Sequence, residues 1–132
     1  MALIQELIHD HKELFCLLDE VRQLGVGNET GRQKLMGAKK ALLAHLEKED
    51  RHLYPKLEQA SRQDPRLGKI YSSFASEMDE ISRFAVAFFE HPWEEKNRLD
   101  FARDFGKLYA TLRQRISREE SILYREFEKL ST

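Results

Sequence analysis

Apolar residues recur every three or four positions over four stretches of the 132-residue chain, which places them on one face of an α-helix. These positions are Ile4, Leu7, Ile8, Phe15, Leu18 and Val21; Leu35, Leu42, Leu46, Leu53 and Leu57; Leu67, Ile70, Tyr71, Phe74, Ile81, Phe84 and Phe88; and Phe101, Phe105, Leu108, Leu112, Ile122, Phe127 and Leu130. The pattern predicts helices over 2–24, 30–61, 66–90 and 93–130. Short connections between long helices favour antiparallel neighbours, so we expect an all-α, up-down-up-down four-helix bundle that forms one domain over residues 1–132.

The breaks between the stretches carry residues that start or end helices. A glycine-rich segment, 25–31, precedes the second stretch, and Thr30 with Gln33 has the spacing of a capping box. Asp64 followed by proline is typical of a helix start, and a proline at position 92 breaks the chain before the fourth stretch. Pro55 lies inside the second stretch, where we expect it to kink the helix.

Polar residues interrupt three of the apolar faces near the midpoint of each helix. His11 stands in the first, His45 and Glu49 in the second, and Arg115 and Glu119 in the fourth. Midpoints of antiparallel helices share one layer, so these side chains should meet in the core. A buried polar layer costs several kcal/mol unless its groups are paired or bound to a metal. Histidine and glutamate four residues apart on one helix face are ligands that a transition metal ion can use, and a polar core network without metal is the other interpretation.

The composition of the chain argues against several classes of function. Basic and acidic residues nearly balance, 22 against 23, so nothing favours nucleic acid or an anionic membrane as a partner. No apolar segment approaches the length of a bilayer crossing, and residues 1–6 do not resemble a signal peptide. Cys16 is the single cysteine, which excludes an intramolecular disulfide and favours a reducing, cytoplasmic location.

Motifs in three helices resemble the hemerythrin-like (HHE cation-binding) family over essentially the whole chain. They are Ile8-His9-Asp10-His11-Lys12-Glu13-Leu14, His45-Leu46-Glu47-Lys48-Glu49-Asp50 followed by Leu53-Tyr54-Pro55-Lys56-Leu57, and Glu119-Glu120-Ser121-Ile122-Leu123-Tyr124. The resemblance implies an antiparallel four-helix bundle with a non-haem di-iron centre that binds or senses dioxygen, handles iron, or responds to oxidative and nitrosative stress. It also implies that His11 and His45 hold one iron and that Glu49 and Glu119 bridge the pair.

The chain departs from the family pattern at two histidines that would hold the second iron. Met78 follows Glu77 where the family has a histidine on the third helix, and Arg115 stands where it has one four residues before the last glutamate. Arginine carries a fixed positive charge and can pair with two carboxylates. We therefore expect Arg115 to bridge Glu49 and Glu119 in place of the second iron, within a core network that includes Met78 and Glu77.

Two states of the site remain open. Without metal, the two carboxylates balance Arg115 and one protonated histidine; with a single iron or zinc, a hydroxide, Glu77 or Glu120 has to supply one more negative charge. The expected cofactor is therefore none or a single iron, with zinc as the other candidate metal.

The predicted function is a metal-free or weakly metal-binding regulatory or interaction module that is not an enzyme. The alternative is a non-haem iron domain that senses dioxygen, redox state or nitrosative stress through His11, His45, Glu49 and Glu119. A phosphotransfer bundle is a third class, which the apolar surroundings of His45 disfavour. An unknown protein partner would dock on an exposed apolar patch, for which we expect Trp93, Phe88 and Phe89. Tyr54, Tyr109 and Tyr124 are expected to pack at the bundle surface.

Overall fold

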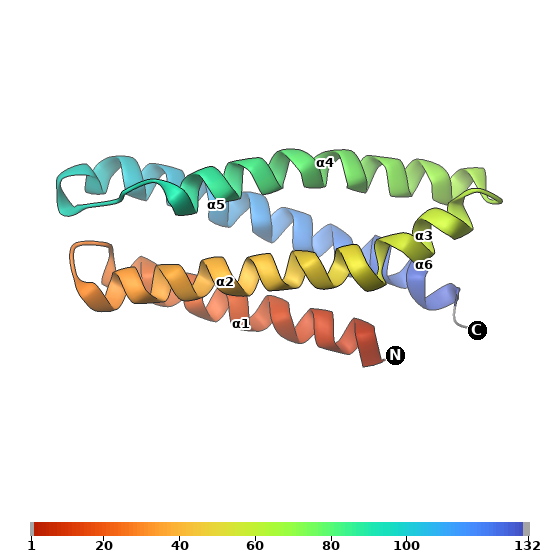
Figure 1. Ribbon diagram of the computed structural model, residues 1–132, viewed down its shortest axis with the longest axis horizontal. Helices are drawn as coiled ribbons and strands as arrows, with labels where there is room; N and C mark the ends of the chain where they lie inside the picture. The colour runs from red at the N-terminus through yellow and green to blue at the C-terminus, as the bar shows by residue number, and fades with distance from the viewer. Residues whose placement is uncertain (1, 131–132) are drawn as a thin grey trace.

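The chain folds into antiparallel helical rods that run the length of the molecule (Figure 1). The computed structural model describes residues 2–130, with the exception of the side chain of Glu95. Its elements are α1 (Ala2–Leu24), α2 (Glu29–His52), α3 (Tyr54–Ser61), α4 (Pro65–Glu90), the 3-10 turn η1 (Glu95–Asn97), α5 (Arg98–Arg118), the π-helical turn η2 (Glu119–Leu123) and α6 (Tyr124–Lys129). The predicted all-α bundle is confirmed.

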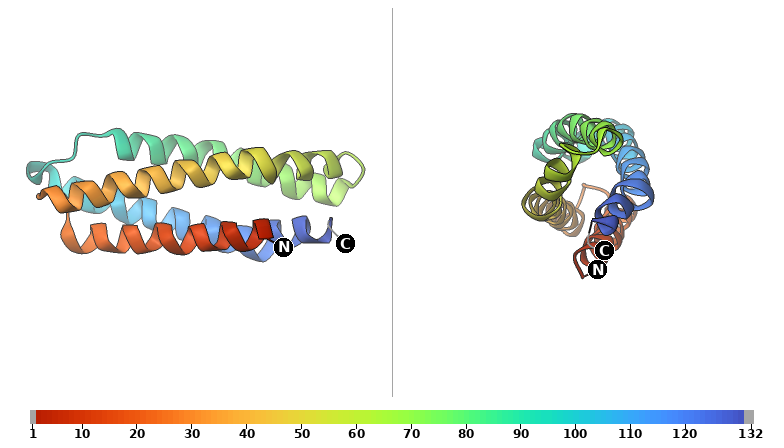
Figure 2. Two further views of the ribbon diagram at one scale, coloured as in Figure 1. Left: turned by 60° about the horizontal axis from the view of Figure 1, so that its bottom comes forward. Right: turned by 90° about the vertical axis from the view of Figure 1, so that its right-hand side faces the viewer.

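Two of the four rods are composite. α3 follows α2 but turns from its axis toward α4 (Figure 1), and η2 and α6 follow α5. The start of α1 and the end of α6 lie at the same end of the bundle (Figure 2). Within residues 2–130, no helix has both the length and the hydrophobicity that a bilayer crossing requires.

The predicted irregularity at Pro55 is confirmed. α2 ends at His52 and α3 begins at Tyr54, with Leu53 between them. The backbone N–H of Leu53 still donates to the carbonyl oxygen of Glu49 at 2.9 Å, and the N–H of Leu57 donates to the Leu53 carbonyl at 3.2 Å. Proline has no N–H to donate, which accounts for the break in the helix. The two hydrogen bonds that remain keep the break local, so the rod continues past it.

Helix starts agree with the sequence at one position and differ at another. Asp64 caps α4 as predicted, because its Oδ1 accepts from the backbone N–H groups of Arg66 and Leu67. The capping box predicted at Thr30 is wrong. The helix begins at Glu29, and the side chain of Asn28 accepts from the N–H of Gly31 at 2.7 Å. Asparagine is as effective a cap as serine or threonine, so the earlier residue takes this role.

The expected exposed patch at Trp93 is also wrong. Trp93, Phe88 and Phe89 are buried, and the indole Nε1–H of Trp93 donates to the Phe88 carbonyl oxygen at 2.8 Å. The chain from position 93 to 97 folds so that this indole points into the core, and these residues are therefore not part of α5. This is why α5 begins at Arg98 and not at position 93.

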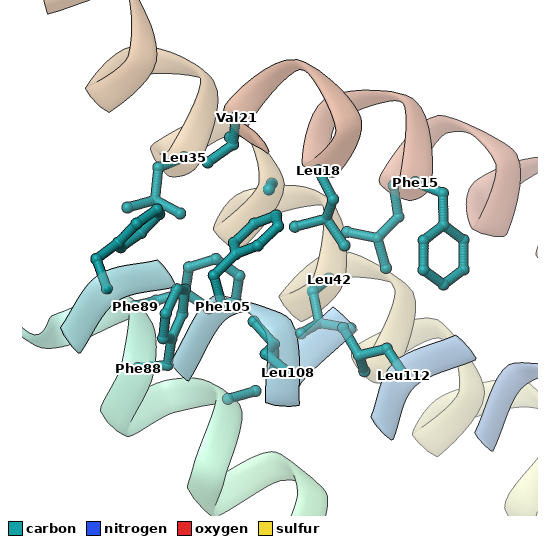
Figure 3. Close-up of a cluster of buried hydrophobic side chains, with 14 of the residues drawn as sticks. Phe15, Leu18, Val21, Leu35, Leu42, Phe88, Phe89, Phe105, Leu108 and Leu112 are labelled. Atoms are coloured by element: carbon teal, nitrogen blue, oxygen red, sulfur yellow. The ribbon is translucent and has the colours of Figure 1, made fainter. Parts of the chain in front are cut away.

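Two apolar clusters fill the core. One surrounds Leu18, Leu42 and Leu108 near the loop between α1 and α2 (Figure 3). The other contains Leu7, Leu53, Leu57, Leu123 and Phe127 at the opposite end. On α1, α2 and the last rod, the polar residues singled out from the sequence fall between members of the first cluster and members of the second.

The π-helical turn changes which side chains face the core in the last rod. Ile122 and Leu130, predicted on the apolar face, are 39% and 43% exposed, whereas Leu123 and Tyr124 are buried. The backbone N–H of Tyr124 donates to the carbonyl oxygen of Glu119, five residues earlier. The wider turn therefore brings positions 119 and 124 to the same face, which an α-helical period of 3.6 residues does not do.

Two glycines provide a matched test of packing, Gly31 in the first turn of α2 and Gly106 inside α5. A Cβ at Gly31 would overlap the backbone carbonyl oxygen of Gly25, whereas a Cβ at Gly106 meets no atom within 4 Å. We expect Gly31→Ala to lower the free energy of unfolding by about 1–3 kcal/mol. Gly106→Ala should raise it by roughly 0.5–1 kcal/mol, because alanine favours the helix. Urea denaturation measures both, and equal effects would contradict this packing.

Candidate metal centre

Five side chains from three rods meet in a layer between the apolar clusters, which we call the polar layer: His11 from α1, His45 and Glu49 from α2, Arg115 from α5 and Glu119 from η2. Each is at most 4% exposed. The structure thus brings together all four residues proposed as ligands from the sequence, each with one ligand atom within 4.8 Å of the others.

The two histidines face each other through the same ring nitrogen. His11 Nε2 and His45 Nε2 are 3.1 Å apart. Their other nitrogens are held by carboxylates, His11 Nδ1 by Glu120 at 2.7 Å and His45 Nδ1 by Asp10 at 3.2 Å. A carboxylate only accepts hydrogen bonds, so each Nδ1 carries the proton and each Nε2 presents a lone pair. Two lone pairs at this distance require a proton or a cation between them.

The two buried carboxylates have incomplete hydrogen bonding. Glu49 Oε2 accepts from the Tyr124 hydroxyl at 2.6 Å, but Glu49 Oε1 is buried with no partner among the described residues. Among the described residues Glu119 has only long contacts: 3.4 Å from Oε2 to Arg115 Nε, 3.5 Å from Oε1 to the Tyr124 hydroxyl and 3.6 Å from Oε1 to His11 Nε2. Buried oxygens are seldom left without a partner, because the loss costs about 1–3 kcal/mol each. The layer lacks positive charge at its centre.

The pKa values in the layer point the same way. Burial and the neighbouring Glu49 carboxylate raise the pKa of Glu119 to about 8. Burial opposes protonation of His45, but the adjacent Glu49 and Asp10 carboxylates outweigh it and raise the pKa of His45. Burial and the neighbouring His45 lower the pKa of His11. Glu119 and His45 therefore keep their protons to higher pH than usual, whereas His11 loses its proton more readily.

Arg115 is buried and fully engaged, although its partners differ from those predicted. Its Nη2 donates to the Tyr54 hydroxyl and to the Phe74 carbonyl oxygen, both at 2.9 Å, and its guanidinium lies over the Phe74 ring. It pairs with Glu119 and, through Nη1, with Glu77 at 3.4 Å. The expectation that it bridges Glu49 and Glu119 is therefore wrong for Glu49, because the hydroxyl and carbonyl acceptors draw the guanidinium toward α4.

Glu77 and Met78 of α4 border the layer without entering its centre. Glu77 is half-buried and receives a 2.6 Å bond from Arg118, which lowers its pKa. Met78 lines a small cavity of about 20 Å³ together with His45, Glu49, Arg115 and Glu119. Neither residue provides a nitrogen or oxygen donor at the point where the two histidines converge.

The sequence did not predict, or predicted only in part, how four further residues contribute to the polar layer. Tyr54 and Tyr124 were expected at the surface but are 9% and 1% exposed, with both hydroxyls inside the layer. Asp10, adjacent to His11 in the chain, orients the other histidine. Glu120 was considered only as a source of charge, yet it holds the imidazole of His11. Glu119 and Tyr124 are five residues apart, a spacing that puts two side chains on one face of a π-helical turn but not of an α-helix.

The donor set fits one cation and does not fit two. Histidine nitrogen and carboxylate oxygen bind transition metals at about 2.0–2.2 Å, so donors around one ion lie roughly 3–4 Å apart. The Nε2 pair, 3.1 Å apart, and Glu49 Oε2, 3.4 Å from His45 Nε2, meet this requirement. A second ion would need ligands where Arg115 and Met78 stand, and neither an arginine nor this thioether replaces the absent imidazoles.

The metal-free protein should lose stability as pH rises. The folded-state pKa values of Glu119 and His45 lie above their ordinary values, so both contributions are present at lower pH and are lost as pH rises through the folded values. His11 contributes with opposite sign, but only below its ordinary pKa of 6.5. We therefore expect the melting temperature of chelator-treated protein to fall from pH 6.5 to about 8.5.

The matched variant for this test is Glu119→Gln, which removes one titrating group and keeps the side-chain shape. It should reduce the fall between pH 6.5 and 8.5. A melting temperature that is flat or rises over this window in the unaltered chain would contradict the charge balance described here.

Comparison with protein families places this geometry in a known context. Residues 2–127 match the family described as Hemerythrin HHE cation binding domain. Neither the curated proteins nor the solved structures contain a match to the chain. The match covers nearly all of the residues and every member of the polar layer. The chain therefore belongs to the hemerythrin HHE cation-binding domain family.

Proposed function

We propose that this domain binds a single transition-metal ion, iron in the first place, through His11, His45, Glu49 and Glu119. The observation that carries the proposal is the pair of Nε2 atoms 3.1 Å apart, each with its Nδ1 committed to a carboxylate. Such carboxylate partners fix the tautomer and orientation of histidines that bind metals. In the same proposal, the domain acts as a regulatory module and not as an enzyme or a two-iron oxygen carrier.

The carboxylates behind the histidines prepare the site before any ion arrives. Lys48 donates to Asp10 at 2.9 Å, so that the carboxylate oriented toward His45 is itself held in place. Glu120 is part-exposed and reaches His11 from the outer side of the bundle. These contacts keep both Nε2 lone pairs aimed at one point. An iron ion bound there would supply one-electron redox chemistry and affinity for small ligands.

Charge balance supports one ion and no more. A divalent ion and Arg115 together carry three positive charges, which Glu49, Glu119 and Glu120 match. Glu120 thus meets the need for a further negative charge, through its 2.7 Å contact with His11. The pairs Asp10 with Lys48 and Glu77 with Arg118 are neutral by themselves. A second divalent ion would leave an uncompensated buried charge, which is strongly unfavourable.

A metal-free interaction module is the second candidate. The raised pKa of His45 favours it, because a proton on Nε2 would lie between His45, His11 and Glu49 and would replace the cation. The same protein would then act through a protein partner, in the reducing cytoplasmic setting that a single cysteine favours. The count of bound metal ions separates the two candidates.

The metal content of the protein tests the proposal. After anaerobic reconstitution with ferrous ion and desalting, we expect about one iron per chain by plasma mass spectrometry. His45→Ala removes one of the two converging nitrogens and should reduce iron binding at least tenfold. His9→Ala is the control, because His9 is an exposed histidine of α1 that pairs with Glu13. Iron absent from the unaltered chain would favour the metal-free module.

The second ion has its own test. In the double variant Arg115→His and Met78→His, two imidazoles replace the cation and the thioether that border the layer. We expect iron uptake to rise from one toward two ions per chain. Two ions in the unaltered protein would show that Arg115 does not limit the site.

A further inference from the structure

We propose that Tyr124 is a fifth donor to the bound ion and coordinates ferric iron through its phenolate oxygen. The inference rests on the proposed function, since it requires a cation in the polar layer. It deepens that function by assigning a tyrosine ligand, which changes the chemistry of the site from that of histidine and carboxylate donors alone.

The position of the Tyr124 hydroxyl is the first observation. Its oxygen lies 2.6 Å from Glu49 Oε2, 3.1 Å from His11 Nε2 and 3.5 Å from Glu119 Oε1. Three of the four proposed ligands therefore surround one phenol oxygen. The side chain is 1% exposed, so no bulk water competes for this position.

The spacing of the donors is the second observation. The atoms that would share one ion are separated by 3.1 Å between the Nε2 nitrogens, 3.4 Å from His45 Nε2 to Glu49 Oε2 and 3.6 Å from His11 Nε2 to Glu119 Oε1. Adjacent ligands at about 2.1 Å from a metal lie roughly 3 Å apart. The contacts of Tyr124 fall in the same range, so its oxygen lies among the donors and not behind them.

The fold holds Tyr124 in this position. The π-helical turn aligns Tyr124 with Glu119, and the phenol ring stacks on the His11 imidazole with 5.7 Å between centroids and 15° between planes. π-helical turns are rare and occur frequently at functional sites. Tyr54 shows the contrast, because its buried hydroxyl accepts from Arg115 and not from a proposed ligand.

Coordination also changes the hydrogen bond between Tyr124 and Glu49. Without iron, the Tyr124 hydroxyl donates to Glu49 Oε2. When ferric iron replaces the phenol proton, that proton passes to solvent, no electron is transferred, and Glu49 is free to bind the ion. Phenolate is a hard, anionic oxygen donor that suits ferric over ferrous iron. Tyr124 thus adds one negative charge for the additional positive charge of the oxidised ion.

The test is the visible spectrum of the iron-loaded protein. The reconstituted chain is oxidised with ferricyanide and desalted, and iron content is measured on the same sample. Phenolate bound to ferric iron gives a visible charge-transfer band, with tyrosine ring vibrations enhanced in the resonance Raman spectrum. We expect this band in the unaltered protein, its loss in Tyr124→Phe at unchanged iron content, and its retention in the matched control Tyr54→Phe.

The outcomes separate the two proposals. Bound iron without the band in the unaltered protein overturns the tyrosine ligand and leaves the single-ion site in place. Loss of the band in Tyr54→Phe with retention in Tyr124→Phe also overturns it. No bound iron overturns both proposals. If Tyr124→Phe does not fold, a band with tyrosine vibrations that persists in Tyr54→Phe supports Tyr124, because the other two tyrosines, Tyr71 and Tyr109, lie outside the layer.

Discussion

The structure depends on the balance of charge in a layer that is cut off from water. Glu49, Glu119 and Arg115 are each at most 3% exposed in the middle of an otherwise apolar bundle. Charges in such surroundings are tolerated only when opposite charges and hydrogen bonds satisfy them. Arg115 has its partners, whereas one oxygen of Glu49 has none among the described residues and Glu119 has only distant ones. The remaining positive charge belongs where the two imidazoles converge, and either a proton or a metal ion can provide it.

The irregularities of the rods lie next to this layer. The break before Pro55 lies beside Tyr54, whose hydroxyl accepts from Arg115, and the π-helical turn begins at Glu119 and ends next to Tyr124. Both irregularities cost free energy compared with a regular α-helix, because backbone hydrogen bonds are lost or lengthened at these points. The two apolar clusters on either side of the layer offset these costs, because burial of their side chains stabilises the fold whatever lies between them.

Much of the fold could be predicted from the sequence, because helical rods follow from a period that covers many residues. The polar layer could be predicted as well, since His11, His45, Glu49, Arg115 and Glu119 each replace an expected apolar residue. The predictions that were wrong concern features that a single turn of the chain decides. One additional residue in a π-helical turn moved Ile122 outward and Tyr124 inward. One indole hydrogen bond buried Trp93, and Asn28 took the cap expected at Thr30. Such alternatives differ by about 1 kcal/mol, which a pattern of apolar positions cannot resolve.

We propose that the polar layer holds one ion while Arg115 occupies the space of a second. An anomalous difference map, recorded at the iron absorption edge from crystals of the iron-loaded protein, tests it directly. We expect one peak between His11 Nε2 and His45 Nε2, with the Arg115 guanidinium still bonded to the Tyr54 hydroxyl and the Phe74 carbonyl oxygen. Two peaks, or one peak at the present position of the guanidinium, would contradict it.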